Sequence, residues 1–241
     1  MKITVCETPD ILGAKAAGEA KAAINAAIKK NGGARIILST GASQFATLEA
    51  LAKQGVEWGK VEMFHLDEYI GIDESHPASF RKYLKERFIS NVGLKEFYLV
   101  DGTEDNIKFI SGKLAEKTAD LGIIGIGENA HIAFNDPPCD FETEDCYITV
   151  TLNEACRRQQ VGEGWFPSFE DVPAQAVSMS CRQIMKCEKI ISAVPFAVKA
   201  KAVCDTLTQP VTNRIPATLL KTHPDWSLYI DKDSAKLIFP K

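Results

Sequence analysis

The chain has 241 residues, of which 45% are hydrophobic and 25% charged, values typical of one large globular α/β domain with a sizeable core. Its formal net charge of -4 argues against a nucleic-acid-binding protein, although local cations can still hold a small anion. There is no apolar run of 18 residues, so we expect no membrane partner, and the first residues become polar too early for a secretory signal.

The seven cysteines and four histidines are spread along the chain. No two cysteines form a C-x-x-C pair, and the histidines lack the spacing of metal ligands. We therefore expect reduced thiols and a cytoplasmic location, with neither a disulfide framework nor a metal site.

Strands and helices are predicted to alternate along the chain. Short runs of apolar β-formers predict strands over 3–6, 34–38, 61–66, 97–100, 121–126, 146–152, 176–180, 189–194 and 227–230. Helices are predicted over 10–30, with Asp10 as N-cap, and over 44–54, 79–88, 106–118, 153–161 and 199–206. This alternation favours an α/β fold: one domain over 1–241, three layers (α/β/α), and a largely parallel, doubly wound sheet.

A hydroxyl-rich loop follows the predicted strand at 34–38 and precedes a helix. It consists of Ser39, Thr40, Gly41, Ala42 and Ser43. Free backbone N–H groups and the helix dipole favour an anion at such a position. A plain capped turn is the alternative.

Two further strands also end in titratable groups. Asp67 and Glu68 follow the strand at 61–66, and His131 follows the strand at 121–126, with Asn129 before it and Asp136 five residues beyond it. Because parallel strands present their carboxyl ends at one edge, we expect all three loops to meet there. An anion site beside an acid–base cluster predicts proton-transfer chemistry on a small phosphorylated metabolite.

Four segments resemble a known family in order and in approximate spacing: STGAS at 39–43, FHLDEYIGI with HPASF at 64–80, GIGENAHIAFNDPP at 125–138, and VPFAVKAKAV at 194–203. The chain resembles the glucosamine-6-phosphate deaminase (isomerase) family, within a superfamily that includes 6-phosphogluconolactonase. The run HIAFN at 131–135 favours the deaminases, because lactonases typically carry a Thr-Ala-Ser-containing version there.

The resemblance implies an aldose–ketose isomerisation without a cofactor, in which glucosamine 6-phosphate and water give fructose 6-phosphate and ammonia. Asp67 matches the family's base, which moves a proton between C2 and C1 of the opened sugar. His131 matches the residue that protonates the ring oxygen. A carboxylate and an imidazole suit these roles when their pKa values lie near the working pH.

The resemblance also implies how the substrate is held. Phosphate would bind to the Thr40–Ser43 loop, to Lys199 rather than Lys201, and to Arg158 rather than Arg157; Glu68 and Ser39 would also contact substrate. The segment Glu154–Asp171 resembles a mobile lid. Its aromatic residues, Trp165 and Phe166, would either shield the closed site or anchor the lid in the core.

Three positions depart from the family pattern: Asn129 replaces an aspartate, Ala130 a glycine, and Asp136 a glutamate. A neutral Asn129 orients the imidazole without stabilising its cation, so the pKa of His131 is expected to fall relative to the usual arrangement. If position 130 needs a positive φ, alanine there costs roughly 1–2 kcal/mol.

Several alternatives remain at this stage. The same chemistry on galactosamine 6-phosphate is a close variant. A 6-phosphogluconolactonase-like hydrolase and a non-catalytic sugar-phosphate sensor are the other two. A homo-oligomer and allosteric control are both compatible with the sequence.

Overall fold

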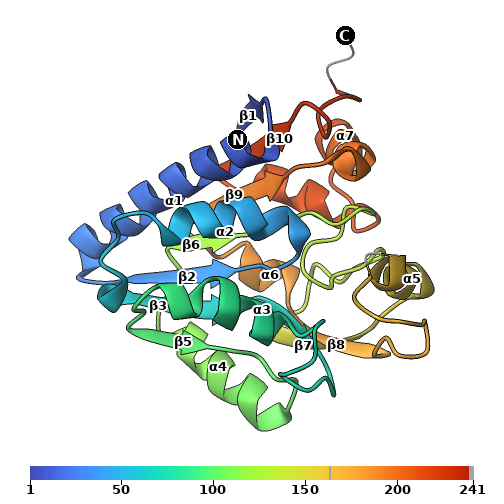
Figure 1. Cartoon of the computed structure of the whole chain (residues 1–241), viewed down its shortest axis with the longest axis horizontal. Helices are drawn as coiled ribbons and strands as arrows, with labels where there is room; N and C mark the ends of the chain where they lie inside the picture. Colours follow the sequence, from blue (N-terminus) through green and yellow to red (C-terminus); the bar gives the residue numbers. More distant parts are fainter. Residues whose placement is uncertain (163, 239–241) are drawn as a thin grey trace.

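The computed structural model describes residues 1–162 and 164–238. Its centre is a sheet of seven strands in the order β1-β10-β9-β6-β2-β3-β5, and every neighbouring pair is parallel (Figure 1). The strands are β1 (Lys2–Cys6), β2 (Ala34–Leu38), β3 (Val61–His65), β5 (Glu96–Tyr98), β6 (Leu121–Ile123), β9 (Lys189–Val194) and β10 (Trp226–Asp231). The predicted three-layer, largely parallel fold is confirmed.

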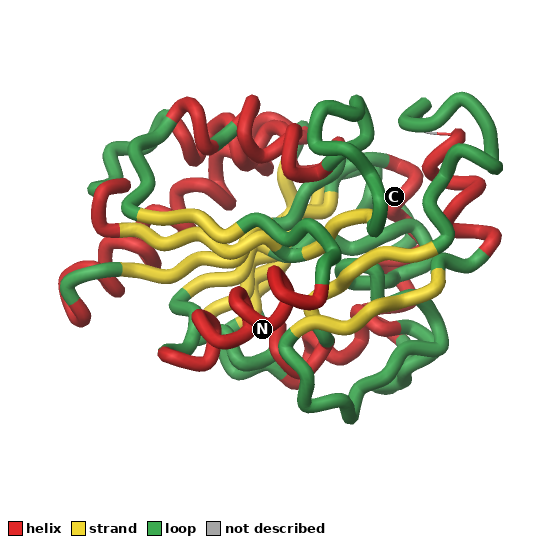
Figure 2. The backbone as a smooth tube through the Cα atoms, turned by 90° about the horizontal axis from the view of Figure 1, so that it is seen from below, coloured by secondary structure: helices red, strands yellow, loops and turns green. Residues whose placement is uncertain are grey.

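Helices cover both faces of this sheet, as the edge-on view in Figure 2 shows. One face carries α1 (Pro9–Asn31), α2 (Phe45–Ala52) and α3 (Phe80–Arg87); the other carries α4 (Glu104–Glu116), α6 (Cys181–Ile184) and α7 (Ala200–Thr208). In β2 successive side chains enter opposite cores: Ile36 and Leu38 pack on the α1 side and Ile37 on the α4 side. A strand buried on both faces reads as a continuous apolar run, which explains why β2 was predictable.

The N-cap of the first helix lies two residues earlier than predicted. Thr8, and not Asp10, is its N-cap, because the Thr8 hydroxyl accepts a hydrogen bond from the Ile11 amide at 3.3 Å. Asp10 lies in the first turn, where its carboxylate interacts favourably with the positive end of the helix dipole.

A second, three-stranded antiparallel sheet was not predicted. It consists of β4 (Asp67–Tyr69), β8 (Gln175–Met179) and β7 (Tyr147–Thr151), and it carries α5 (Glu154–Gly162) at its far end (Figure 1). Leu66 alone separates β3 from β4, so the sequence reads as one strand ending in polar residues. The strands predicted at 146–152 and 176–180 are confirmed as β7 and β8, but they pair antiparallel in this second sheet and not in the parallel one.

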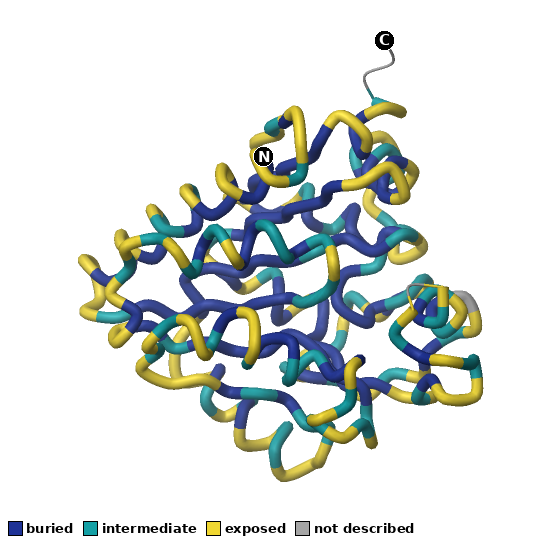
Figure 3. Tube along the Cα trace, viewed as in Figure 1, coloured by how far each residue is buried: buried dark blue, intermediate teal, exposed yellow. Residues whose placement is uncertain are grey.

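Burial follows this architecture closely. The central strands form the continuous buried region of Figure 3, and the helices present exposed outer faces. No helix in the described part of the chain is long and apolar enough to cross a bilayer.

Candidate active site

The carboxyl ends of β2, β3, β6 and β9 surround a cavity of about 260 Å³. The structure brings together there most of the side chains singled out from the sequence: Ser39, Thr40, Gly41, Ala42, Ser43, Asp67, His131 and Lys199 all line it. The three loops thus meet at one sheet edge, because the strands that precede them are parallel.

Asp67 faces the cavity from the first position of β4 and is only 6% exposed. Burial, with a smaller contribution from the neighbouring Glu68 carboxylate, raises the pKa of Asp67 to about 8. Among the described residues nothing donates a hydrogen bond that would offset this. Asp67 can therefore hold or release a proton near neutral pH, which an ordinary carboxylate cannot do.

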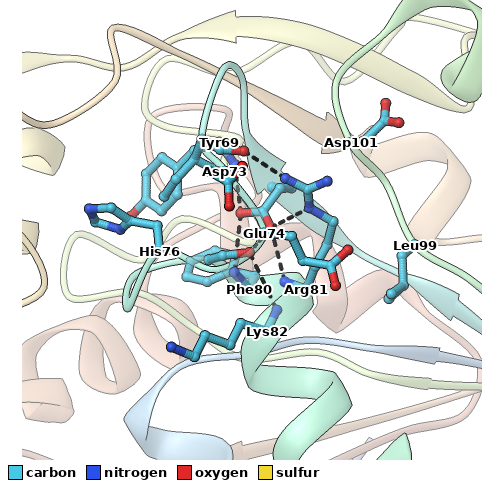
Figure 4. A network of polar contacts seen from close by, with 12 residues as sticks. Tyr69, Asp73, Glu74, His76, Phe80, Arg81, Lys82, Leu99 and Asp101 are labelled. Carbon is cyan, nitrogen blue, oxygen red and sulfur yellow. Dashed lines mark hydrogen bonds and ion pairs between the residues drawn. The ribbon is translucent and has the colours of Figure 1, made fainter.

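Glu68, which the sequence assigned to substrate, lies outside the cavity lining and is fully buried. Its carboxylate accepts hydrogen bonds from the Ser79 hydroxyl, from the amides of Phe80 and Arg81, and from Arg81 Nε at 3.2 Å. Figure 4 shows Phe80 and Arg81 gathered at this network. Side chains alternate along β4, so Glu68 points away from the face that carries Asp67 and stabilises the start of α3 instead.

The Nδ1 atom of His131 contacts two residues, Asn129 and Asp136, that do not line the cavity. This atom lies 2.6 Å from Asn129 Oδ1 and 3.1 Å from Asp136 Oδ1, and Asn129 Nδ2 donates to the same Asp136 oxygen at 3.1 Å. Burial alone would raise the pKa of Asp136, but the His131 ring and the Asn129 amide outweigh it, and the pKa is lowered. Two acceptors at Nδ1 favour a proton there, which leaves Nε2 for chemistry.

Gly127 lies against the imidazole ring. A Cβ built on Gly127 would come within 2.2 Å of His131 Nε2, so any larger residue would displace the ring. At the other end of the loop, Asn135 Nδ2 donates to Met179 O at 2.9 Å and to Ser178 Oγ at 3.1 Å, which ties the loop to β8. The second sheet therefore fixes the position of His131.

Backbone strain is concentrated around the cavity. Ala130 has a φ of +64°, Ala133 of +52° and Phe196 of +83°, and these are the positive-φ residues other than glycine in the described chain. Such conformations cost about 1–3 kcal/mol each and persist where neighbouring contacts impose them. At Ala130 the imposing contact is a 2.9 Å hydrogen bond from the Ala217 amide to its carbonyl.

The hydroxyl-rich loop has the open backbone expected of an anion site. Gly41, with a φ of +97°, turns the chain into a short 3₁₀ segment, Ala42–Gln44, ahead of α2. Ser39 Oγ accepts a hydrogen bond from the Gly125 amide at 3.2 Å and so joins the ends of β2 and β6. Across the cavity, Lys199 is 9% exposed at the start of α7 and adds a cation.

The predicted lid contributes Gln159, Gln160 and Trp165 to the cavity lining. Phe166 is instead a core residue, 4% exposed, that packs edge-on to Tyr69 with ring centroids 5.4 Å apart. Trp165 therefore lines the cavity and also packs against the core cluster to which Phe166 belongs; its shielding of a closed site stays a prediction.

The two lid arginines lie away from the cavity lining. Arg158 is two-thirds exposed and pairs with Glu154 one turn earlier on α5, at 2.5 Å. Arg157 donates to the carbonyls of Phe169 and Val172 at 2.7 and 2.8 Å. Phosphate binding by Arg158 stays a prediction, because this arrangement gives its guanidinium a different partner.

Residues 7–228 match the family model described as glucosamine-6-phosphate isomerases/6-phosphogluconolactonase. The chain belongs to this family. A glucosamine-6-phosphate deaminase of Streptococcus pneumoniae strain 70585 is 32% identical over 214 residues, which cover 86% of this chain and 88% of the relative. Within a superfamily whose members act on sugar phosphates, this chain is therefore similar to the deaminases in sequence.

Two solved structures share this fold. A monomeric glucosamine-6-phosphate deaminase superposes with a TM-score of 0.87 at 27% identity, covering 98% of this chain and all of that one. A 6-phosphogluconolactonase from Trypanosoma brucei superposes with a TM-score of 0.78 at 16% identity, covering 99% of this chain and 98% of that one. The second likeness concerns the fold alone.

Several cavity residues were not singled out from the sequence of this family member. They are Phe80, Phe134, Gln159, Gln160, Phe196 and Val198. All six lie inside the quoted family segments or the predicted lid, but an aromatic, aliphatic or amide side chain has no local signal that separates cavity lining from core. The described residues contain no group of three or more His, Cys, Asp and Glu side chains that could hold a metal.

Proposed function

We propose that the protein is an amino-sugar phosphate deaminase/isomerase that converts glucosamine 6-phosphate and water into fructose 6-phosphate and ammonia. The observation that carries this proposal is the placement of Asp67, buried and with its pKa raised to about 8, in one cavity with His131 and the hydroxyl-rich loop. Relatives named glucosamine-6-phosphate deaminase support the same substrate.

The reaction begins with ring opening. His131 donates a proton from Nε2 to the ring oxygen of the pyranose as the bond from C1 to that oxygen breaks, and Nε2 then takes up the proton that the C1 hydroxyl releases; the Nδ1 proton stays with Asn129 and Asp136. Asp136 carries the negative charge that stabilises the imidazolium, because Asn129 supplies only a neutral amide. The open-chain aldehyde can then be isomerised.

Asp67 performs the isomerisation. As a carboxylate it takes the proton from C2 to give an enolamine and returns it to C1, while one proton passes from the amino nitrogen to O1, so that the amino aldehyde becomes a C1 alcohol with an imine at C2. Water then adds to C2 and ammonia leaves, giving the ketose. Burial of Asp67 excludes bulk water, so the proton is retained between the two transfers.

The phosphate lies at the opposite side of the cavity in this proposal. Backbone amides of the Thr40–Ser43 loop and the ammonium of Lys199 are the groups that would bind it. Binding of the phosphate would hold C1 and C2 of the sugar next to the Asp67 carboxylate. Proton transfer then takes place between groups that are already positioned within one enzyme–substrate complex.

The test is release of ammonia from glucosamine 6-phosphate and, separately, from galactosamine 6-phosphate by the purified protein. Asp67→Asn serves as the inactive variant, and Asp105→Asn, an exposed carboxylate at the start of α4, as the matched control. Ammonia from one epimer, lost in Asp67→Asn and kept in Asp105→Asn, supports the proposal and identifies the epimer.

Other outcomes would contradict it. Hydrolysis of a 6-phosphogluconolactone without ammonia release would indicate the lactonase activity found elsewhere in the superfamily. Saturable binding of both hexosamine phosphates with no turnover of any of the three compounds would indicate a sensor.

A further inference from the structure

The backbone of Phe196 adopts a conformation that is rare for any residue other than glycine. Phe196 joins β9 to α7 with a φ of +83° and a ψ of 145°, a region that is essentially reserved for glycine. Its side chain is 39% exposed at the mouth of the cavity, so core packing of the phenyl ring does not impose this conformation. A contact to its backbone must do so.

That contact is the carboxylate of Asp231, at the carboxyl end of β10. Asp231 Oδ2 accepts a hydrogen bond from the Phe196 amide at 3.0 Å, and Asp231 Oδ1 accepts one from the Ser234 amide at 2.7 Å. Asp231 is 1% exposed, and within the described part of the chain no lysine or arginine pairs with it. A buried carboxylate bound to two backbone amides is a fixed anchor rather than a surface charge.

The sheet places this anchor beside the strained residue. In the parallel pair β10–β9, Ile230 lies opposite Val194, so Asp231, one residue further, reaches the chain that leaves β9. A second hydrogen bond links Phe196 to Lys199. The Lys199 amide donates to the Phe196 carbonyl at 3.0 Å and closes the 3₁₀ turn Ala197–Lys199. Lys199 lines the cavity directly after this turn.

We propose that Asp231 is a positioning residue for substrate phosphate: it holds Phe196 in its strained conformation and thereby presents Lys199 to the phosphate group. The inference rests on the proposed function in one respect, namely that the anion at Lys199 is the phosphate of a sugar phosphate. Asp231 itself does not line the cavity. Its effect is expected in binding and not in the chemical step.

The experiment measures the affinity for fructose 6-phosphate by calorimetry, together with KM and kcat for glucosamine 6-phosphate. Asp231→Asn can accept from only one of the two amides, since its Nδ2 is a donor, so we expect Kd and KM to rise about tenfold, the loss typical of a hydrogen bond to a charged acceptor. We expect kcat to change less than about twofold. Asp233→Asn, an exposed carboxylate two residues away, is the matched control and should leave both constants unchanged.

A rescue separates positioning from mere stability. Glycine adopts the Phe196 conformation without strain, so in a Phe196→Gly background Asp231→Asn should raise Kd by less than about twofold. Asp231→Glu, which keeps the charge but moves the oxygens, should behave like Asp231→Asn in the Phe196 background and provides a second variant if the asparagine form does not fold.

Failure of the Asp231 inference can be told apart from failure of the proposed deaminase function. A wild-type protein that binds fructose 6-phosphate but releases no ammonia contradicts the deaminase while leaving the Asp231 test intact. The inference is overturned if wild type does not bind fructose 6-phosphate, if Asp231→Asn lowers the melting temperature with Kd unchanged, or if the tenfold effect persists in the Phe196→Gly background.

Discussion

The two edges of the parallel sheet use charge in opposite ways. At the amino edge, polar side chains are paired with one another: Glu62 binds both Arg35 and Lys95, at 3.2 and 2.7 Å, and Glu19 on α1 binds Lys189 and Lys2. At the carboxyl edge, Asp67 is buried without a neutralising partner.

Backbone geometry follows the same division. The described positive-φ residues that are not glycine all lie around the cavity at the carboxyl edge. Strain and an unpaired carboxylate both lower stability, and they are retained where the surrounding structure imposes them. The sheet therefore carries a stabilising set of ion pairs at its amino edge and the candidate active site at its carboxyl edge.

The largest expected effect tests the carboxyl edge. Asp67→Asn should lower kcat for ammonia release by about 10²–10⁴-fold, the usual contribution of a positioned acid–base group. The same change should raise the melting temperature by roughly a few degrees, because it removes a carboxylate whose ionisation in the folded state is made costly by burial. Parallel activity and melting measurements check both, and a variant that is inactive but less stable would contradict the comparison.

The pH dependence of this stabilisation has a definite sign. The folded pKa of Asp67, about 8, lies above the ordinary value of 3.8, so the folded state binds the proton more tightly. Wild-type stability should therefore fall relative to Asp67→Asn as pH rises between about 4 and 8, and the two should converge below pH 4. Urea unfolding at several pH values measures this, and a gap independent of pH would show that Asp67 does not titrate in that range.

The next effect tests the amino edge. Burial alone would raise the pKa of Glu19, but hydrogen bonds from Lys189, Ser227, Tyr229 and Lys2 outweigh it and lower the pKa to about 2. Glu19→Gln should therefore cost about 2–4 kcal/mol at pH 7, as expected when one partner of a largely buried ion pair is removed. The cost should shrink as pH falls from 4.5 toward 2.

Activity provides the control for that substitution. Because Glu19 lies at the opposite edge from the cavity, kcat and KM per folded molecule should stay at wild-type values. A Glu19→Gln protein with normal stability and impaired turnover would reverse the proposed division between the two edges.

A smaller effect is expected beside His131. Asn129→Asp places a second carboxylate at Nδ1, which should stabilise the protonated imidazole and extend turnover to higher pH. The sign follows because the proposed mechanism uses protonated His131 as its acid. Asn91→Asp, at an exposed position, is the matched control, and an unchanged pH profile of kcat would show that His131 does not limit ring opening.

The smallest effect concerns strain alone. Ala130→Gly should raise stability by about 0.5 kcal/mol, since the relief of a positive φ exceeds the entropy cost of glycine and the loss of one buried methyl. Ala26→Gly, on the exposed face of α1, should lower stability by about 1 kcal/mol. Chemical denaturation of both variants checks the contrast, and equal losses at the two positions would mean that Ala130 is not strained.

The local sequence pattern was sufficient to predict much of the fold and of the candidate active site. The apolar runs predicted the strands of the parallel sheet, most clearly β2 and β9, which are buried on both faces and therefore read as largely apolar segments. Parallel order then predicted that the loops carrying Ser39–Ser43, Asp67 and His131 meet at one edge, and the structure places all of them on the cavity. Even the strain at Ala130 was anticipated as a consequence of alanine at a positive φ.

Tertiary structure decided what each of those side chains does. Asp67 and Glu68 are adjacent and chemically alike, yet β4 turns one into the cavity and the other onto the start of α3. Likewise, Asp231 is an ordinary strand-end aspartate in the sequence, and only the pairing of β10 with β9 brings it to Phe196. The physical reason is the same in each case: burial and hydrogen-bond partners come from residues distant in the chain, and they determine the pKa and position of a charged group.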